Sequence, residues 1–153
     1  MLRHGESTWN AEGRMQRQIA HPPLTERGAL QAYAAGDTLR DNGIDRIVTS
    51  DAVRATQTAR AVAQILEVPV SVDVRLRERG WAEPGHLEDP APRVLAALSA
   101  IAISGDRVAV VTHGDIVYLL RDMLCATQDW ETGSDVPHCV AFAARPQALS
   151  GRQ

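Results

Sequence analysis

Short apolar runs alternate with helix-periodic segments along this chain, and the alternation restricts the fold more than any other feature of the sequence. Residues 106–113 contain the unbroken apolar run 108–111, which is typical of a strand covered on both faces, and helical patterns flank them. We expect helices over residues 25–42, 51–68, 93–104 and 114–126, and strands over residues 44–50, 68–76, 106–113 and 137–145. This order predicts an α/β fold, a three-layer α/β/α sandwich with a mostly parallel central sheet.

The chain has 153 residues, about the length of one domain, and no repeat or linker divides it, so we expect a single domain over residues 1–153. Its formal net charge of −3 gives no reason to expect binding to nucleic acid or to a membrane, because both need a dense basic surface. Two cysteines, Cys125 and Cys139, are too few for a disulfide framework, and no apolar run is long enough to span a membrane. The cytoplasm is the compartment that we expect.

Polar and charged residues gather where the expected strands end. Those ends supply six residues, namely Arg3, His4, Ser50, Arg54, Glu78 and His113. The carboxyl ends of parallel strands meet at one edge of a sheet, where α/β proteins form their binding sites. The set therefore predicts a site for phosphoryl transfer.

Each residue type in this set suits one step of that chemistry. Arginine binds phosphate oxygens with its planar fork of N–H groups, so Arg3 and Arg54 are expected to hold the phosphate. A neutral imidazole can attack phosphorus and carry the phosphoryl group, and neighbouring cations favour the neutral form. One histidine would then be the nucleophile and the other a donor to the phosphate, while Glu78 is the candidate proton donor to the leaving alkoxide.

The first strand is unusually short. Only Met1 and Leu2 precede Arg3, whereas strands usually run to about five or six residues. Either this strand is short or the protein starts earlier.

Several motifs follow one another in the order typical of the histidine phosphatase superfamily, the phosphoglycerate mutase-like proteins. "RHGESTWN" (residues 3–10) resembles the first motif of branch 1, and "GRMQ" (13–16) and "PLTERG" (23–28) resemble the next two. "SDAVRATQTA" (50–59), "LRE" (76–78) and "HG" (113–114) continue the resemblance. The chain is similar to a short form of this family with a reduced cap.

The resemblance implies that His4 is phosphorylated. It implies catalytic roles for His4, Glu78 and His113, and phosphate or substrate contacts for Arg3, Asn10, Arg54 and Gly114. The expected function is hydrolysis of a phosphomonoester, with a phosphorylated small molecule or a phosphoprotein as substrate and without a cofactor. No residues have metal-ligand spacing such as His-Glu-x-x-His, so no metal is expected.

Two departures from the family pattern bear on the substrate. Many branch members have glycine after the glutamine of "GRMQ" and an aspartate soon after it, whereas this chain has Arg17, with His21 near the place of the aspartate. The interval from Glu78 to His113 is short for the family and leaves little room for the helical cap that encloses small metabolites. An open site suits a bulky substrate and disfavours mutase activity, which a closed site without water assists.

Several alternatives stay open at this point. Glu83 and Asp115 are further candidates for the proton donor, although an aspartate just after a strand is more often a helix N-cap. The alternative functions are a phosphotransferase or mutase that uses the same residues, and a non-catalytic phosphate-binding or regulatory module. Three further histidines are interpreted as surface or substrate-rim residues, namely His21, His86 and His138.

Overall fold

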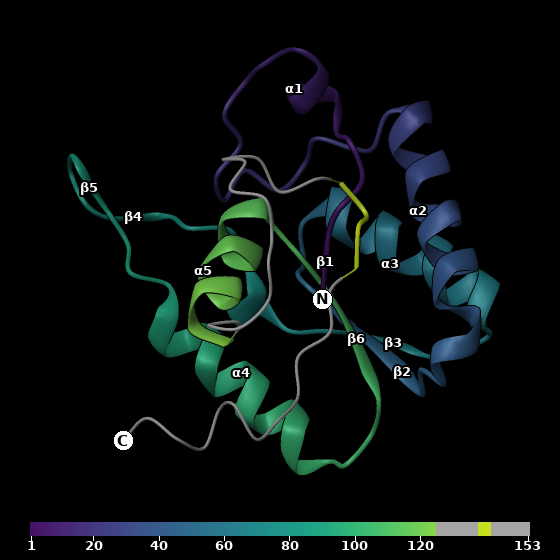
Figure 1. Cartoon of the computed structure of the whole chain (residues 1–153). Helices are drawn as coiled ribbons and strands as arrows, with labels where there is room; N and C mark the ends of the chain where they lie inside the picture. The colour runs from purple at the N-terminus through teal and green to yellow at the C-terminus, as the bar shows by residue number, and fades with distance from the viewer. Residues whose placement is uncertain (125–137, 142–153) are drawn as a thin grey trace.

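A four-stranded parallel sheet forms the centre of the structure (Figure 1). The computed structural model describes residues 1–124 and 138–141. Its sheet has the order β1 (Leu2–Arg3), β6 (Val108–Thr112), β2 (Arg46–Thr49) and β3 (Val70–Val72). Leu2 pairs with Val111, and Ile47 pairs with both Ala109 and Val70. Because β6 lies between β1 and β2, the residues that follow these three strands meet at one edge of the sheet.

Helices cover both faces of this sheet, which confirms the expected three-layer fold. α2 (Glu26–Leu39) and α3 (Val53–Leu66) pack on one face, and α4 (Ala91–Ile103) and α5 (Gly114–Leu124) pack on the other (Figure 1). Ala109 and Val111 of β6 belong to the apolar cluster under α2 and α3, whereas Val110 belongs to the cluster under α4 and α5. The central strand is apolar along its length because it serves both layers.

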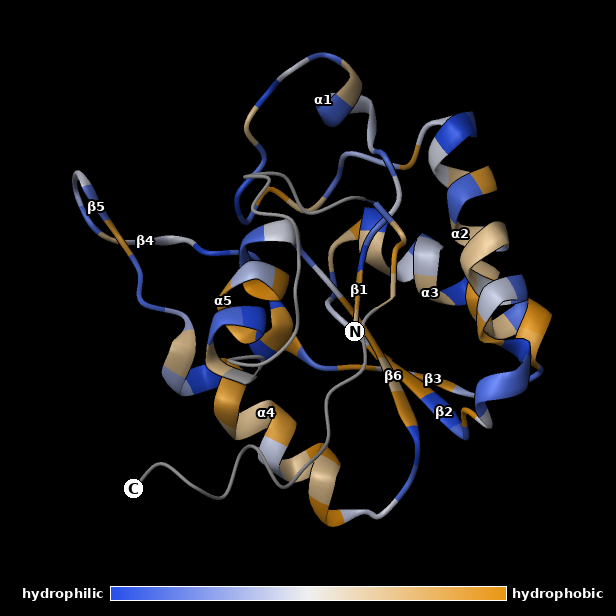
Figure 2. Ribbon diagram, in the orientation of Figure 1, coloured by the Kyte–Doolittle hydropathy of each residue, from blue (hydrophilic) through white to orange (hydrophobic). Residues whose placement is uncertain are grey.

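Figure 2 shows the apolar residues along the strands and on the sheet-facing sides of the helices, with polar residues outside. Among the residues that the structure describes, no helix is long and apolar enough to cross a membrane.

Local sequence signals set the ends of two helices as predicted. The side chain of Thr25 accepts a hydrogen bond from the backbone N–H of Gly28 and so caps the start of α2. α2 continues into the 3-10 helix η1 (Arg40–Asn42) and stops at Gly43, whose φ of 63° is favourable for glycine. α3 ends at Leu66, three residues before Pro69.

The strand expected over residues 68–76 is shorter in the structure, because β3 covers only three of these residues. The carboxylate of Asp73 accepts a hydrogen bond from the backbone N–H of Arg75 at 2.9 Å and begins the 3-10 helix η2 (Val74–Leu76). The strand expected over residues 137–145 lies largely outside the described residues, and within it His138 and Cys139 form a turn instead. Residues 125–126, the expected end of the last helix, also lie outside them.

The segment between Glu78 and α4 holds only a small antiparallel hairpin, formed by β4 (Trp81–Glu83) and β5 (His86–Leu87). The hairpin projects from the body of the molecule (Figure 1), and Trp81 on it is 62% exposed. This segment therefore contains no helical cap, in agreement with the short interval in the sequence. A second small element that the sequence did not predict is the one-turn helix α1 (Thr8–Ala11).

Two glycines allow α2 to pack directly against the backbone of the first loop. A Cβ atom added at Gly28 would overlap the backbone of Glu6, and one added at Gly5 would overlap the carbonyl of Gly28. Glycine at residue 28 of "PLTERG" is therefore required by the close approach of two backbones, and not by its φ angle.

We expect Gly28→Ala to lower the free energy of unfolding by about 3 kcal/mol, because backbone atoms cannot move aside as side chains do. Urea denaturation would measure the change. Gly80→Ala is the control, since its Cβ would meet the amide end of the flexible Gln18 side chain, which can move aside, and should cost less. An equal loss in the two variants would contradict this explanation of the motif.

Candidate active site

The loops after β1 and β6 border a cavity at the carboxyl edge of the sheet. It has a volume of about 570 Å³. Six residues of the sequence motifs described above line it, namely Arg3, His4, Asn10, Gln16, Glu78 and Gly114. Arg54 and His113 are buried next to this lining, with exposures of 0% and 1%. The parallel strands thus bring together the residues that sequence analysis placed at their ends.

His4 is held in a conformation that leaves one ring nitrogen available. Its backbone N–H donates to the carbonyl of Thr112 at 2.9 Å, which continues the pairing of β1 with β6. Its Nδ1 lies 2.6 Å from the carbonyl oxygen of Gly5. Because a carbonyl only accepts, Nδ1 carries the proton, and in the neutral ring Nε2 keeps its lone pair.

The surroundings of His4 favour this neutral ring. Burial lowers the pKa of His4 well below its usual value, and the positive charges of Arg54 and Arg3 lower it further. The hydrogen bond to Gly5 acts in the opposite direction but does not outweigh them. The side chain is only 2% exposed.

Hydrogen bonds fix the loop that follows His4. The backbone N–H of Gly5 donates to Oγ1 of Thr58, a buried residue of α3, at 3.0 Å. Ser7 and Asn10 form a capping box at α1, in which Ser7 Oγ accepts from the backbone N–H of Asn10 and the Asn10 amide oxygen accepts from that of Ser7. Asn10, which lines the cavity, therefore also stabilises the loop.

Arg54 connects three segments behind the cavity. It donates from Nη2 to a Glu78 carboxylate oxygen at 2.8 Å and to the carbonyl oxygen of Arg17 at 3.0 Å. It also donates from Nη1 to the carbonyl oxygen of Ile19 at 2.7 Å, while its buried Nε has no hydrogen-bond partner among the described residues. Arg54 therefore positions the carboxyl group of Glu78 and the loop after Gln16.

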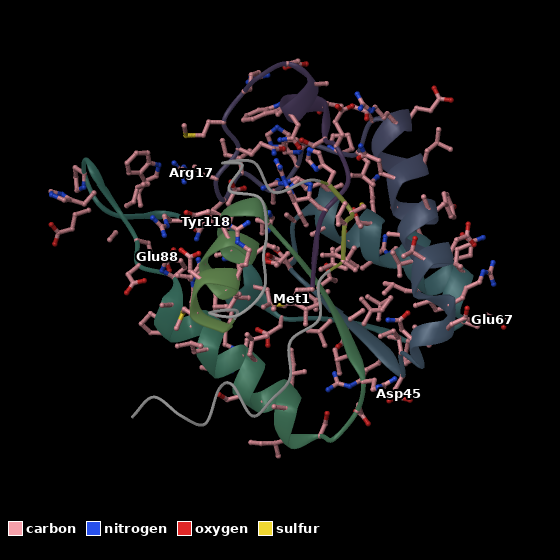
Figure 3. The ribbon with its side chains drawn as sticks, viewed as in Figure 1. Met1, Arg17, Asp45, Glu67, Glu88 and Tyr118 are labelled. Carbon is pink, nitrogen blue, oxygen red and sulfur yellow. The ribbon has the colours of Figure 1, made fainter. Side chains whose placement is uncertain are left out.

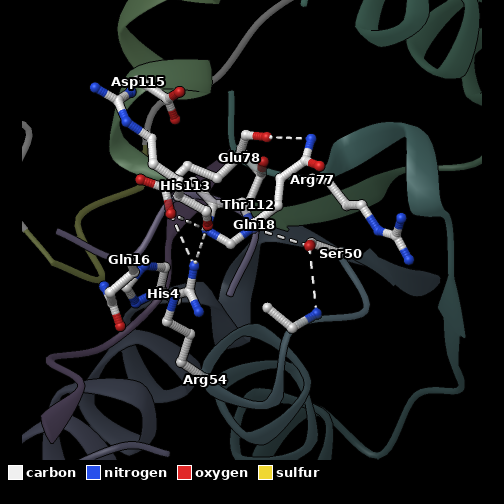
Figure 4. A network of polar contacts seen from close by, with 12 residues as sticks. His4, Gln16, Gln18, Ser50, Arg54, Arg77, Glu78, Thr112, His113 and Asp115 are labelled. Carbon is white, nitrogen blue, oxygen red and sulfur yellow. Dashed lines mark hydrogen bonds and ion pairs between the residues drawn. The ribbon is translucent and has the colours of Figure 1, made fainter. Parts of the chain in front are cut away.

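Glu78 lies between Arg54 and His113 (Figure 4), and its Oε2 is 3.6 Å from Nδ1 of His113. Burial raises the pKa of Glu78, and the carboxylate of Asp115 raises it further. Arg54 lowers this pKa by a smaller amount, so the pKa remains above that of an ordinary glutamate. The carboxyl group of Glu78 therefore stays protonated up to a higher pH than the carboxyl group of an exposed glutamate does.

The two alternative acids are placed differently. Glu83 is on the exposed hairpin and is not part of the cavity lining. Asp115 lines the cavity, but its two carboxylate oxygens accept hydrogen bonds from the backbone N–H groups of Arg79 and Ile116, at 2.9 and 2.8 Å. Of the three candidates, Glu78 alone contacts Arg54 and lies beside His113.

His113 faces His4 across the site. The ring centroids are 5.3 Å apart, and Nε2 of His113 is 2.9 Å from Oγ of Ser50 at the end of β2. Its buried Nδ1 has no hydrogen-bond partner within the described part of the chain. Burial, together with the neighbouring His4 and Arg54, lowers the pKa of His113 well below its usual value.

Gly114 lies against Arg3. A Cβ atom at Gly114 would come within 3.1 Å of Nε of Arg3, closer than most side-chain contacts allow. Glycine after His113 therefore leaves room for the Arg3 side chain, which lines the cavity.

Of the three further histidines, His138 contacts His4, and no pattern in the sequence indicated this contact. Nδ1 of His138 donates to the carbonyl oxygen of His4 at 2.7 Å, and the two rings are 5.6 Å apart, so the half-buried His138 lies beside His4. His21 is exposed and packs edge-on against Trp9, and His86 is exposed on the hairpin. Within residues 1–124 and 138–141, no three His, Cys, Asp or Glu side chains are grouped as a metal ion requires.

Comparison with known protein families gives one clear match. The model of the histidine phosphatase superfamily (branch 1) matches residues 1–90. The probable phosphoglycerate mutase GpmB of Salmonella typhi is 44% identical over 163 residues, which covers 85% of this chain and 75% of that protein. The GpmB of Klebsiella pneumoniae is 42% identical over 90 residues, or 58% of this chain, and the match spans about two fifths (41%) of the length of that relative.

Solved structures are similar over most of the chain. A structure titled Mycobacterial hydrolase 1 has a TM-score of 0.73 and 30% identity, covering 83% of this chain and 78% of that one. The mycobacterial glucosyl-3-phosphoglycerate phosphatase in complex with VO3 has a TM-score of 0.70 and 29% identity, covering 81% and 78%. A phosphoglycerate mutase from Bacillus anthracis shares the fold, with a TM-score of 0.73 at 23% identity, covering 82% and 78%.

Proposed function

Because this chain belongs to the histidine phosphatase superfamily (branch 1), we propose that it hydrolyses phosphate monoesters through a phosphoryl group carried on Nε2 of His4. The observation that carries the proposal is the hydrogen bond from Nδ1 of His4 to the carbonyl of Gly5, which leaves the lone pair of Nε2 available in the lining of the cavity. The lowered pKa of His4 supports the same assignment, since the ring stays neutral and nucleophilic into the acid range.

Buried donors beside His4 would bind the phosphate. Nε of Arg54 and Nδ1 of His113 are buried without hydrogen-bond partners among the described residues, which is costly unless a ligand supplies acceptors. Phosphate oxygens are acceptors with negative charge, so they would compensate these donors together with Arg3. Nδ1 of His113 can donate to a phosphate oxygen when it carries the ring proton. Nε2 of the neutral ring then accepts a hydrogen bond from Oγ of Ser50.

The reaction then takes two displacements. Nε2 of His4 attacks phosphorus as the ester P–O bond breaks, and Glu78 gives its proton to the departing alkoxide oxygen. A water molecule next attacks phosphorus as the P–N bond breaks, and it gives its proton to the Glu78 carboxylate. The phosphate leaves, and His4 and Glu78 return to their starting states. The substrate is a phosphorylated small molecule or a phosphoprotein.

Transfer to a second alcohol is the alternative outcome, because the relatives include proteins named as phosphoglycerate mutases. The segment after Glu78 forms only the β4–β5 hairpin, which leaves the site more accessible to water than a helical cap would. Water is therefore favoured as the acceptor.

Hydrolysis of p-nitrophenyl phosphate in the presence of a chelator tests the proposal. We expect release of inorganic phosphate equal to that of p-nitrophenol, and the same equality when glycerol is added as an alcohol acceptor. Less phosphate than nitrophenol would assign the chain to the phosphotransferases. Folded protein that binds phosphate but releases no nitrophenol would identify a phosphate-binding module instead.

A further inference from the structure

The mouth of the cavity carries positive charge that the proposed chemistry does not use. Three arginines line it, Arg14, Arg17 and Arg79, together with three apolar or aromatic side chains, Met15, Leu87 and Tyr118. Figure 3 shows Arg17 and Tyr118 on the same side of the molecule. None of these six residues is needed to attack phosphorus or to protonate the leaving group.

Arg17 occupies a backbone conformation that favours glycine. Its φ is 49°, in the left-handed region, and its carbonyl is held there by the hydrogen bond from Arg54. Many members of the family have glycine after the glutamine of this motif, and glycine would adopt the same conformation more easily. Strain at a residue that lines a ligand cavity suggests that its side chain has a function there.

Two of the three guanidinium groups at the mouth, those of Arg17 and Arg79, have no ion-pair partner among residues 1–124 and 138–141. Arg14 is paired with Glu12 at 3.1 Å and stacks over the ring of Trp9. Arg17 makes a contact of 3.3 Å with Sδ of Met15, and no carboxylate of the described residues is within ion-pair distance of it. Nε of Arg79 is buried without a hydrogen-bond partner in the same part of the chain.

Two nearby carboxyl groups have other hydrogen-bond donors, and neither forms an ion pair with Arg17 or Arg79 in the described part of the chain. Glu78 is bound by Arg54, and both oxygens of Asp115 accept backbone N–H groups. Arg17 is nonetheless close enough to Glu78 for its charge to lower the pKa of that carboxyl group. Arg17 and Glu78 also line the same cavity, so the leaving group that Glu78 protonates would occupy a space that Arg17 borders.

The apolar residues and the size of the cavity indicate how large that leaving group is. Met15, Leu87 and Tyr118 are 67%, 41% and 44% exposed, and all three line the cavity. A volume of about 570 Å³ is in the range of pockets that enclose whole organic ligands, and it exceeds what a phosphate group requires.

We infer that the mouth is a second anion site, in which Arg17 and Arg79 bind an acidic group carried by the leaving group of the substrate. The body of that leaving group packs against Met15, Leu87 and Tyr118. The substrate class is thus a bulky phosphomonoester whose alcohol or phenol bears a second negative charge. The position of its phosphate rests on the proposed function, whereas the second anion site is defined by its own residues.

Binding of phosphonates, which are not hydrolysed, tests this inference separately from catalysis. Carboxybenzylphosphonate and carbamoylbenzylphosphonate, each as the meta and the para isomer, have nearly the same shape and differ in one charge. By calorimetry, we expect the carboxylate of at least one isomer to bind roughly ten-fold more tightly than its amide, as a charge-assisted hydrogen bond provides. Equal affinities within both pairs would overturn the second anion site. A clear preference for the carboxylate without any turnover of p-nitrophenyl phosphate would instead contradict the proposed hydrolysis and support the second anion site.

Variants of Arg17 then assign the preference to its guanidinium. Arg17→Gly should abolish most of the preference for the carboxylate without lowering the unfolding temperature, because glycine accepts the φ of 49°. Arg17→Lys should keep part of it. Arg60→Gln removes the same charge from the exposed surface of α3 and should leave the preference unchanged. A preference that survives in Arg17→Gly, or that Arg60→Gln reduces equally, would overturn the role of Arg17.

Discussion

Replacement of His4 by alanine is expected to reduce turnover of every phosphomonoester by at least about 10⁴-fold, and to abolish the phosphoenzyme. No other described residue has a ring nitrogen that is unprotonated, lies in the cavity lining and is fixed by a hydrogen bond from the opposite nitrogen to a carbonyl. Rapid mixing with ³²P-labelled substrate and quenching in alkali, in which phosphohistidine survives, would measure the phosphoenzyme directly.

A control is needed because His4 is buried and its loss leaves a cavity. His86→Ala removes an exposed histidine from the β4–β5 hairpin and should keep full activity. Phosphate binding by His4→Ala would show that Arg3, Arg54 and His113 are still in place. A folded His4→Ala protein that keeps most of its turnover, or that still becomes labelled, would exclude His4 as the nucleophile.

The central part of this site could be predicted from sequence because the sheet is parallel. Apolar runs located the ends of β2 and β6, and a parallel sheet brings such ends to one edge, so Ser50 and His113 were expected in one site. Their distance of 2.9 Å in the structure agrees with that reasoning. Apolar patterning was sufficient here because burial on both faces restricts these strands more than those at the edge of the sheet.

Other contacts depend on loop conformation, which periodicity does not encode. Arg54 was expected to bind phosphate, and the structure shows in addition that it binds the carbonyl groups of Arg17 and Ile19, from a loop more than 30 residues away in the chain. The positive φ of Arg17 could have been suspected from the glycine that the family often has at this position. The direction in which the guanidinium group of Arg17 points could not be predicted in this way.

His138 illustrates the same limit. It lies 134 residues after His4 in the sequence, and the segment around it was expected to be a strand, with the histidine at the surface or at the rim of the substrate site. In the structure a turn directs its ring toward the backbone of His4. A single hydrogen bond between distant segments carries no periodic signal, so only the folded chain reveals it.

Replacement of Glu78 by glutamine is expected to separate substrates by their leaving groups. Glutamine can still accept the hydrogen bond from Arg54 but has no acidic proton. Turnover of an alkyl phosphate such as glycerol phosphate should fall by about 10²–10⁴-fold, whereas p-nitrophenyl phosphate, whose phenolate leaves without a proton, should lose much less. The retained aryl activity shows within the same experiment that the variant is folded.

The pH dependence of the wild type follows from the same proton. Glu78 must be protonated to act as the acid, and burial and Asp115 raise its pKa, so activity on alkyl phosphates should extend above the usual carboxyl range and fall as the pH rises through that raised pKa. In Glu78→Gln this alkaline decrease should be absent. A decrease that persists unchanged would assign it to another group.

Asp115→Asn distinguishes the two acids that line the cavity. If Asp115 acts only by its charge, its loss lowers the pKa of Glu78, and the alkaline decrease moves to lower pH while turnover at acidic pH stays close to that of the wild type. If Asp115 were the proton donor, Asp115→Asn and not Glu78→Gln would show the large loss confined to alkyl phosphates. The exposed Glu83→Gln serves as the matched control and should change neither the pH profile nor the ratio of alkyl to aryl turnover. The arrangement of Glu78 between Arg54 and His113 leads us to expect the first result.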